Sequence, residues 1–173
     1  MEKKHINKLV REIARGNTAA AEELYELMKR PLISFVAPSL CDFAEAEDVV
    51  QSVFLKIIQK SGDLTFFSDA FAWIFKIARN ECSDRLRARS RELHTDSAWG
   101  NDGTGTDFAA FADLDLALRK LSEDDRRMVW LKYYAGFTGK EVAQVFGVSE
   151  ATVSRRLAEI LDRLRRWTDG GEN

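Results

Sequence analysis

The side chains best suited to contacting nucleic acid gather in one C-terminal segment, residues 147–159, which reads GVSEATVSRRLAE. Arginine can bind guanine through two hydrogen bonds in the major groove or can simply contact phosphate, and the sequence leaves both roles open for Arg155 and Arg156. Polar neighbours surround them on the outer side of a predicted helix. The residues that we expect to contact DNA here are Ser149, Glu150, Thr152, Ser154, Arg155, Arg156 and Glu159.

The elements that must position these side chains are predicted to be the two helices of a helix-turn-helix. Gly147 is expected to form the tight turn with a positive φ, and Ser149 is expected to cap the second helix. The inner-face and core positions are expected to be Val142, Ala143, Phe146, Val148, Val153, Leu157, Ile160, Leu161 and Leu164. An ordinary helical hairpin with solvated arginines remains the alternative.

Helical periodicity extends over most of the remaining chain. Apolar residues recur at helical spacing at Ile6, Leu9, Val10 and Ile13, and at Ala46, Val49, Val50, Val53, Phe54, Ile57 and Ile58. Pro31 and Pro38 are the only prolines, and no segment shows sustained strand alternation. These patterns predict an all-α protein.

One interior segment, residues 91–112, breaks this periodicity and is rich in Gly, Thr and Asp. It indicates a flexible linker between two small helical domains, residues 1–90 and 113–173. A long surface loop within a single domain is the alternative.

Charge is distributed unevenly along the chain. The total of 26 basic and 28 acidic residues, a net charge of -2, argues at first against a nucleic-acid-binding protein. Residues 76–91, however, contain six basic and two acidic residues, whereas residues 92–125 contain nine acidic and two basic residues. A polyanion would therefore meet a basic helix end, although the net charge of the whole chain is slightly negative.

Metal, membrane and catalytic signals are weak. Cys41, Cys82, His5 and His94 match no metal-ligand spacing, so we expect no metal or other cofactor and two buried thiols. No apolar run approaches the roughly 18 residues of a membrane span, and the N-terminus lacks a signal core, which predicts a cytoplasmic protein without membrane insertion. The acidic cluster near residue 46 has no accompanying histidine pair, and no Ser/His/Asp set is placed for catalysis, so an enzyme is disfavoured.

Two further stretches combine with the C-terminal motif. Residues 44–57 (AEAEDVVQSVFLKI) predict an amphipathic helix with an acidic start, and residues 69–91 (DAFAWIFKIARNECSDRLRARSR) place aromatic residues before a basic run. With residues 117–157 (ALRKLSEDDRRMVWLKYYAGFTGKEVAQVFGVSEATVSRRL), they resemble the extracytoplasmic-function (ECF) group of sigma-70-family sigma factors. The resemblance covers residues 6–167 in the family's order.

The resemblance implies a bacterial transcription initiation factor that binds promoter DNA and the clamp and flap of core RNA polymerase. Sigma region 2, residues 1–90, would contact the clamp, and region 4, residues 113–173, would bind the flap and the -35 element. The polymerase-binding residues are expected to be Asp48, Gln51 and Phe54. An anti-sigma factor is the further partner that the family implies, able to hold the protein at the inner membrane, and no small-molecule substrate is expected.

Promoter opening requires the capture of unstacked bases beside a basic track, which aromatic and basic side chains can supply. The candidates for contacting the -10 element are Phe66, Phe67, Ser68, Phe71, Arg79, Asn80, Arg85 and Arg87. Phe71 suits a core position equally well, and Trp73, Phe75 and Ile77 are expected in the core. The arginines from Arg85 onward are expected to hold phosphates, with a solvated helix end as the alternative.

The recognition segment departs from familiar members of the family. They often carry Arg where this chain has Ser154, Ser where it has Arg155, and a basic residue where it has Glu159. The -35 sequence is therefore not transferable from a relative. A helix-turn-helix regulator that acts without polymerase would explain residues 136–167 but not the two N-terminal stretches.

Overall fold

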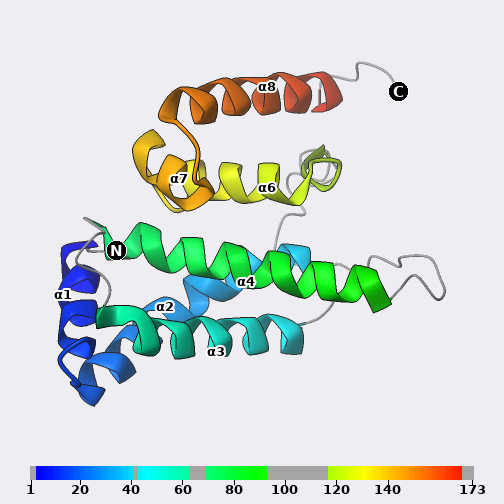
Figure 1. Cartoon of the computed structure of the whole chain (residues 1–173). Coiled ribbons are helices and arrows are strands. Elements are labelled where there is room, and N and C mark those ends of the chain that lie inside the picture. Colours follow the sequence, from blue (N-terminus) through cyan, green and yellow to red (C-terminus); the bar gives the residue numbers. More distant parts are fainter. Residues whose placement is uncertain (1–2, 41–42, 63–68, 93–116, 169–173) are drawn as a thin grey trace. The chain divides into compact units, whose positions relative to one another are not determined.

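The computed structural model describes residues 3–40, 43–62, 69–92 and 117–168 of the 173-residue chain (Figure 1). All regular elements among these residues are helices, which confirms the predicted all-α class. The chain divides into two compact units, Met1–Asn101 and Asp102–Asn173. This boundary falls within the predicted linker, residues 91–112, nearly all of which lies outside the described residues.

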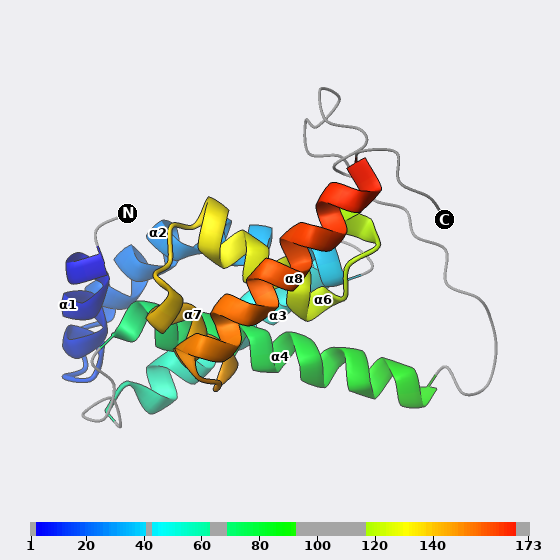
Figure 2. The ribbon, with the colours of Figure 1, turned by 90° about the horizontal axis from the view of Figure 1, so that it is seen from above.

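The first unit contains α1 (Lys3–Ile13), α2 (Thr18–Val36), a 3-10 turn η1 (Ala37–Ser39), α3 (Phe43–Lys60) and α4 (Ala70–Glu92). The Asn17 side chain caps α2 by accepting a hydrogen bond from the Ala20 amide at 3.3 Å. Helices α3 and α4 run side by side, and α1 lies at one end of the unit (Figures 1 and 2). The Asn7 side chain accepts a hydrogen bond of 2.7 Å from the Ala70 amide, which joins α1 to the start of α4.

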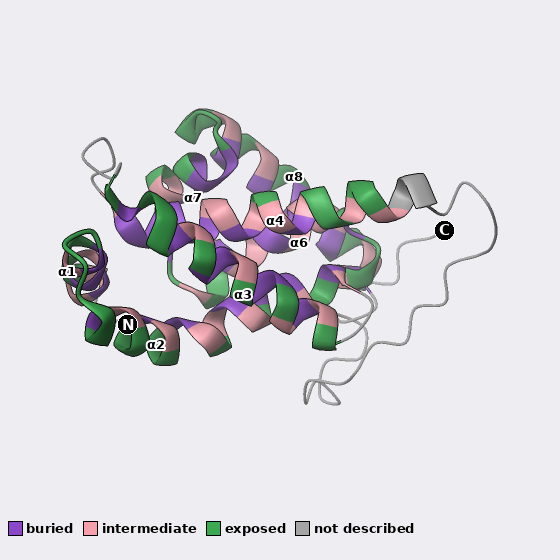
Figure 3. Ribbon diagram, turned by 60° about the horizontal axis from the view of Figure 1, so that its bottom comes forward, coloured by how far each residue is buried: buried purple, intermediate pink, exposed green. Residues whose placement is uncertain are grey.

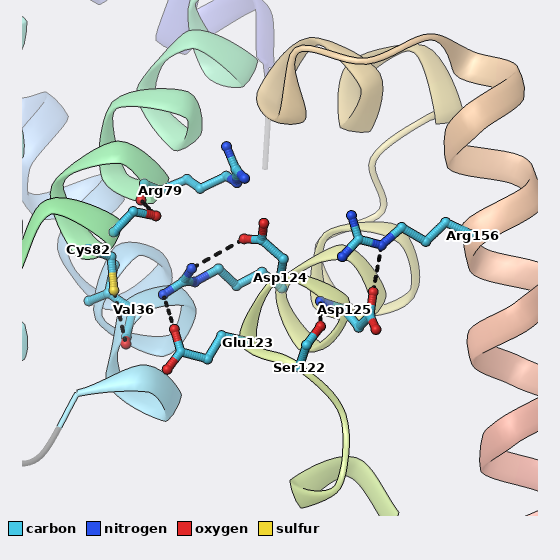
Figure 4. A network of polar contacts seen from close by, with 10 residues as sticks. Val36, Arg79, Cys82, Ser122, Glu123, Asp124, Asp125 and Arg156 are labelled. Atoms are coloured by element: carbon cyan, nitrogen blue, oxygen red, sulfur yellow. Dashed lines mark hydrogen bonds and ion pairs between the residues drawn. The ribbon is translucent and has the colours of Figure 1, made fainter. Parts of the chain in front are cut away.

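Apolar faces of all four helices form the core of the first unit (Figure 3). The expected stripe of α1 is buried at every position, and Phe35 of α2 meets Phe75 of α4 edge to face at 5.1 Å between ring centroids. Cys82 is buried, and its thiol faces the carbonyl oxygen of Val36 (Figure 4). Cys41 lies outside the described residues.

Two core predictions for this unit need correction. Ile58, the last apolar position of the stripe in α3, is 52% exposed, whereas its neighbour Ile57 is fully buried. Ile77 is half-buried, whereas Trp73 and Phe75 are core residues as expected.

The second unit contains α6 (Glu123–Val129), a π-helical turn η5 (Trp130–Tyr134), α7 (Gly139–Phe146) and α8 (Glu150–Thr168). Ser122 caps α6 by accepting a hydrogen bond of 3.2 Å from the Asp125 amide. Thr138 and Glu141 form a capping box at the start of α7. Helix α8 packs against both α6 and α7 around buried residues that include Met128, Phe137, Val142, Val153 and Ile160.

Neither membrane spans nor metal clusters are found among the described residues. No helix in that part of the chain is long and apolar enough to cross a bilayer. The same residues contain no group of three or more His, Cys, Asp and Glu side chains that is placed to hold a metal ion.

Candidate nucleic-acid interface

The predicted helix-turn-helix is formed by α7 and α8. Gly147 ends α7 in the left-handed conformation with φ of 68°, a value that glycine adopts without a steric penalty. The Ser149 hydroxyl accepts a hydrogen bond of 3.1 Å from the Thr152 amide and so caps α8. Both predictions are confirmed, and their cause is local: the turn and the cap each require a specific residue type.

The inner faces of these helices follow the expectation at all but two positions. Val142, Ala143 and Phe146 are buried on α7, as are Val153, Leu157, Ile160 and Leu164 on α8. Val148 is exposed, because it belongs to the short connection between the two helices rather than to either packed face. Leu161 is half-buried at the border of the apolar stripe.

The outer face of α8 carries most of the predicted DNA contacts. Glu150, Ser154, Arg155 and Glu159 are exposed, and Thr152 is half-buried. Arg155 and Glu159 approach to 4.0 Å across one helical turn, with both side chains well exposed. The Ser149 and Thr152 hydroxyl groups lie 2.8 Å apart and are therefore already engaged with each other at the helix start.

Glu150 lies back over the start of α7. A Cβ atom added to Gly139 would stand 2.9 Å from the Glu150 Oε1 atom, so the absence of a side chain at Gly139 leaves room for this carboxylate. A negative charge is favourable beside the first turn of a helix. Glu150 is thus placed beside the first turn of α7 as well as on the predicted DNA-contacting side of α8.

Arg156 is placed differently from its neighbour Arg155. Its Nε atom donates a hydrogen bond of 2.6 Å to Oδ1 of Asp125 on α6 (Figure 4). Nη2 of Arg163 donates one of 2.7 Å to Oδ2 of the same carboxylate. Asp125 is 5% exposed. Sequence analysis missed both Asp125 and Arg163, although the seven-residue spacing of Arg156 and Arg163 beside the apolar stripe places them on one helix face.

The Asp125 carboxyl group is held in its ionised form. Burial by itself raises the pKa of an aspartate, but here hydrogen bonds from Arg163, Arg156 and Ser122 outweigh burial and keep the pKa below its ordinary value. The charge on Arg156 is therefore met by a permanent negative charge within the same unit.

In the first unit, the described basic candidates lie along α4. Arg79 is half-buried, and Asn80, Arg85 and Arg87 are exposed. Arg85 approaches Asp48 of α3 at 3.8 Å, and Arg87 approaches Asp84 at 3.2 Å. The structure thus brings a predicted DNA contact, Arg85, beside a predicted polymerase contact, Asp48.

Two aromatic candidates are core residues. Phe71 is 2% exposed and packs against Phe75 at 5.2 Å between ring centroids, so it is not available to capture a base. Phe54 is likewise buried, with its ring 4.8 Å from that of Tyr25, and is corrected from a polymerase contact to a packing residue. Both lie on the inner faces of their helices, where burial removes the apolar surface of their rings from water. Phe66, Phe67 and Ser68 lie outside the described residues.

The outer face of α3 carries the remaining polymerase candidates, Asp48 and Gln51, both exposed. Leu55 and Ile58 are also exposed on this helix, a feature that sequence analysis missed. Ion pairs join α3 to its neighbours: Lys56 meets Glu81 of α4, and Glu47 lies 3.4 Å from Lys29 of α2. These pairs help to set α3 against α2 and α4.

Comparisons with known proteins agree with this arrangement. The family model "Sigma-70 region 2" matches residues 24–92, and "Sigma-70, region 4" matches residues 111–164. The chain is 34% identical over 170 residues to the ECF RNA polymerase sigma factor SigL of Mycobacterium tuberculosis (strain Erdman), covering 88% of this chain and 94% of that one. It is 26% identical over 175 residues to SigK of Mycobacterium ulcerans (strain Agy99), covering 95% and 94% respectively.

The solved structure of CnrH in complex with the cytosolic domain of CnrY has the same fold. Its TM-score is 0.72 at 23% identity, over 97% of this chain and 99% of that one. The two helical units and their matched regions therefore define a sigma-70-type transcription initiation factor. The chain belongs to the ECF group of RNA polymerase sigma factors, whose members bind core RNA polymerase and promoter DNA.

Proposed function

We propose that the two units of this sigma factor divide promoter recognition between them. Region 2, within residues 1–90, contacts the polymerase clamp through the outer face of α3 and the -10 element through α4 and residues 66–68. Region 4, within residues 113–173, contacts the flap and places α8 on the -35 element. Residues 91–112 connect the two regions.

The observation that carries the proposal is the arrangement at the start of α8. A left-handed glycine turn and a serine cap lead into a helix whose outer side presents Ser154, Arg155 and Glu159 to solvent. This is the geometry in which the second helix of a helix-turn-helix contacts base edges in the major groove. The segment also lies within the match to sigma region 4.

Support for the role of the first unit comes from α3 and α4. Asp48 and Gln51 are exposed on one helix, while Asn80, Arg85 and Arg87 are exposed on the other. Arginines at an exposed helix end can exchange their carboxylate partners for phosphates at little cost. After the correction of Phe71 and Phe54, the proposed polymerase contacts are Asp48 and Gln51, and base capture is assigned to Phe66 and Phe67.

We further propose control by an anti-sigma factor. Support comes from two structures that resemble this chain: CnrH was solved with the cytosolic domain of CnrY, and RpoE of Bartonella quintana with the anti-sigma factor NepR at a TM-score of 0.68 and 24% identity. The proposed location is the cytoplasm, with retention at the inner membrane when the anti-sigma factor is anchored there. No enzymatic activity of its own is proposed.

In vitro transcription with core polymerase over a library of randomised promoters tests this function. The expected result is initiation from promoters that share one -10 and one -35 sequence, and none when the sigma factor is omitted. Initiation without enrichment at either element would contradict the proposal.

The alternative of a regulator that acts without polymerase predicts a different result. It leaves the match of residues 24–92 to sigma region 2 unexplained. A pull-down with core polymerase separates the two functions, because tight operator binding without polymerase association would favour the regulator.

A further inference from the structure

We infer that Asp125 is a positioning residue for α8: it holds this helix through Arg156 and Arg163, so that Arg155, and not Arg156, contacts DNA. The inference rests on the proposed binding of α8 to the -35 element. It assigns different roles to two adjacent arginines that the sequence alone leaves equivalent.

The first support is the geometry of the carboxylate. Each Asp125 oxygen accepts a hydrogen bond from a different arginine, Oδ1 from Arg156 at 2.6 Å and Oδ2 from Arg163 at 2.7 Å. The Asp125 side chain is almost inaccessible to solvent. The backbone amide of Asp125 donates a hydrogen bond to the Ser122 hydroxyl at the start of α6, which fixes the residue from its other side. Short charge-assisted hydrogen bonds of this kind are directional and strong.

The second support is the spacing of the two arginines. They are seven positions apart, so they stand two turns apart on one face of α8, about 10.5 Å along its axis. Apolar contacts at Val153, Leu157 and Ile160 decide which face of the helix is buried, but such contacts are not directional. Two fixed polar points on the same face oppose both sliding and rotation of the helix.

The third support is the contrast with Arg155. The Arg155 side chain is 76% exposed, and its acidic neighbour Glu159 lies 4.0 Å away and is itself exposed. A phosphate or a guanine can replace such a partner with little loss of free energy. Arg156 would instead have to leave a buried carboxylate without one of its two partners, which carries a high desolvation penalty.

A matched pair of variants in the holoenzyme tests the assignment. Arg155→Gln and Arg156→Gln remove the same charge from adjacent positions, and binding to a promoter fragment is measured at several salt concentrations. Arg155→Gln is expected to make the slope of log K against log salt shallower by about 0.9, because one cation no longer displaces counterions. Arg156→Gln is expected to leave the slope unchanged while promoter affinity falls roughly tenfold and base preference at the -35 element broadens.

A third variant, Arg163→Gln, keeps the test decisive if Arg156→Gln fails to fold. Arg163 lies two turns beyond Arg156 on α8, farther from the start of the helix, yet its replacement is expected to broaden base preference at the -35 element as Arg156→Gln does. A slope reduced by Arg156→Gln as much as by Arg155→Gln, or an unchanged base preference in Arg163→Gln, would overturn the inference. Failure of the wild-type holoenzyme to select any -35 sequence would instead overturn the proposed function.

Discussion

Two arginines on α4 and two on α8 differ in the burial of their acidic partners. On α4, Arg85 and Arg87 meet acids that are largely exposed, at 3.8 Å and 3.2 Å. On α8, Arg156 meets a buried aspartate at 2.6 Å, and Arg163 shares that aspartate. Exposed ion pairs add little to stability and exchange partners easily, whereas a buried pair is costly to break. The difference teaches that adjacent basic residues can differ in how readily they exchange a carboxylate for a phosphate, according to whether that carboxylate is exposed or buried.

The largest expected effect comes from breaking the buried cluster. Asp125→Asn should lower the free energy of unfolding of the second unit by about 2 kcal/mol, since both arginines lose their ionic partner. Chemical denaturation of the full chain, followed by the fluorescence of its tryptophans, measures the change. The matched control is Asp162→Asn, which removes an exposed partner of Arg166 and should cost under about 0.5 kcal/mol. Equal costs for the two variants would remove the distinction between buried and exposed pairs.

Acid should weaken the same cluster. The pKa of Asp125 is lower in the folded protein than its ordinary value of 3.8, so the carboxylate contributes stability that is fully present above that value. This contribution is lost as the pH falls below 3.8 through the folded pKa. The difference in unfolding free energy between wild type and Asp125→Asn should therefore be constant near neutral pH and should shrink below about pH 4. A difference that stays constant down to pH 2 would show that the carboxylate is not held ionised by its partners.

A smaller effect on stability, but a clear effect on DNA binding, is expected on α4. Replacing Arg85 and Arg87 together by Ala should reduce open-complex formation and make its salt dependence shallower by about 1.4 to 1.8 in log–log slope, for two lost phosphate contacts. Open complexes are counted by permanganate reactivity at several salt concentrations. An unchanged slope would show that these arginines are solvated and do not contact phosphates.

The smallest expected effect comes from the acid that faces Arg85. Asp48→Asn should change the unfolding free energy by less than about 0.5 kcal/mol, because both side chains are exposed. The Asp48→Asn variant should also associate more weakly with core polymerase, because Asp48 is a proposed clamp contact. A competition pull-down against wild type measures this association. Glu26→Gln, a change of the same kind at an exposed position on α2, is the control. A stability loss comparable to that of Asp125→Asn would contradict the contrast between the two units.

Much of the helix-turn-helix could be predicted because its signals are local. Gly147 must adopt a positive φ, and Ser149 must present an oxygen to the first turn of α8, and each requirement selects a residue type at one position. Apolar spacing likewise predicted the buried faces of α1 and most of α3. Val148 and Ile58 were placed wrongly because an apolar residue next to a buried one need not share its direction.

The partners of the functional side chains were not predictable in the same way. Phe71 and Phe54 are aromatic residues of a kind that can contact bases or proteins. Apolar spacing put Phe54 on the stripe of α3 and left Phe71 open, and the packing of α4 and α3 against their neighbours shows that both rings are in the core. Burial depends on which faces meet, and composition does not record this.

The sequence by itself determined the helical class, the order of the segments that mark the family, and the turn that precedes α8. All of these follow from short-range periodicity, capping and backbone conformation. Only the tertiary structure decided which of two adjacent arginines is already engaged. Arg156 meets Asp125 across 31 positions of sequence, and the strength of that pair comes from a buried environment that exists only once α6 and α8 have packed together.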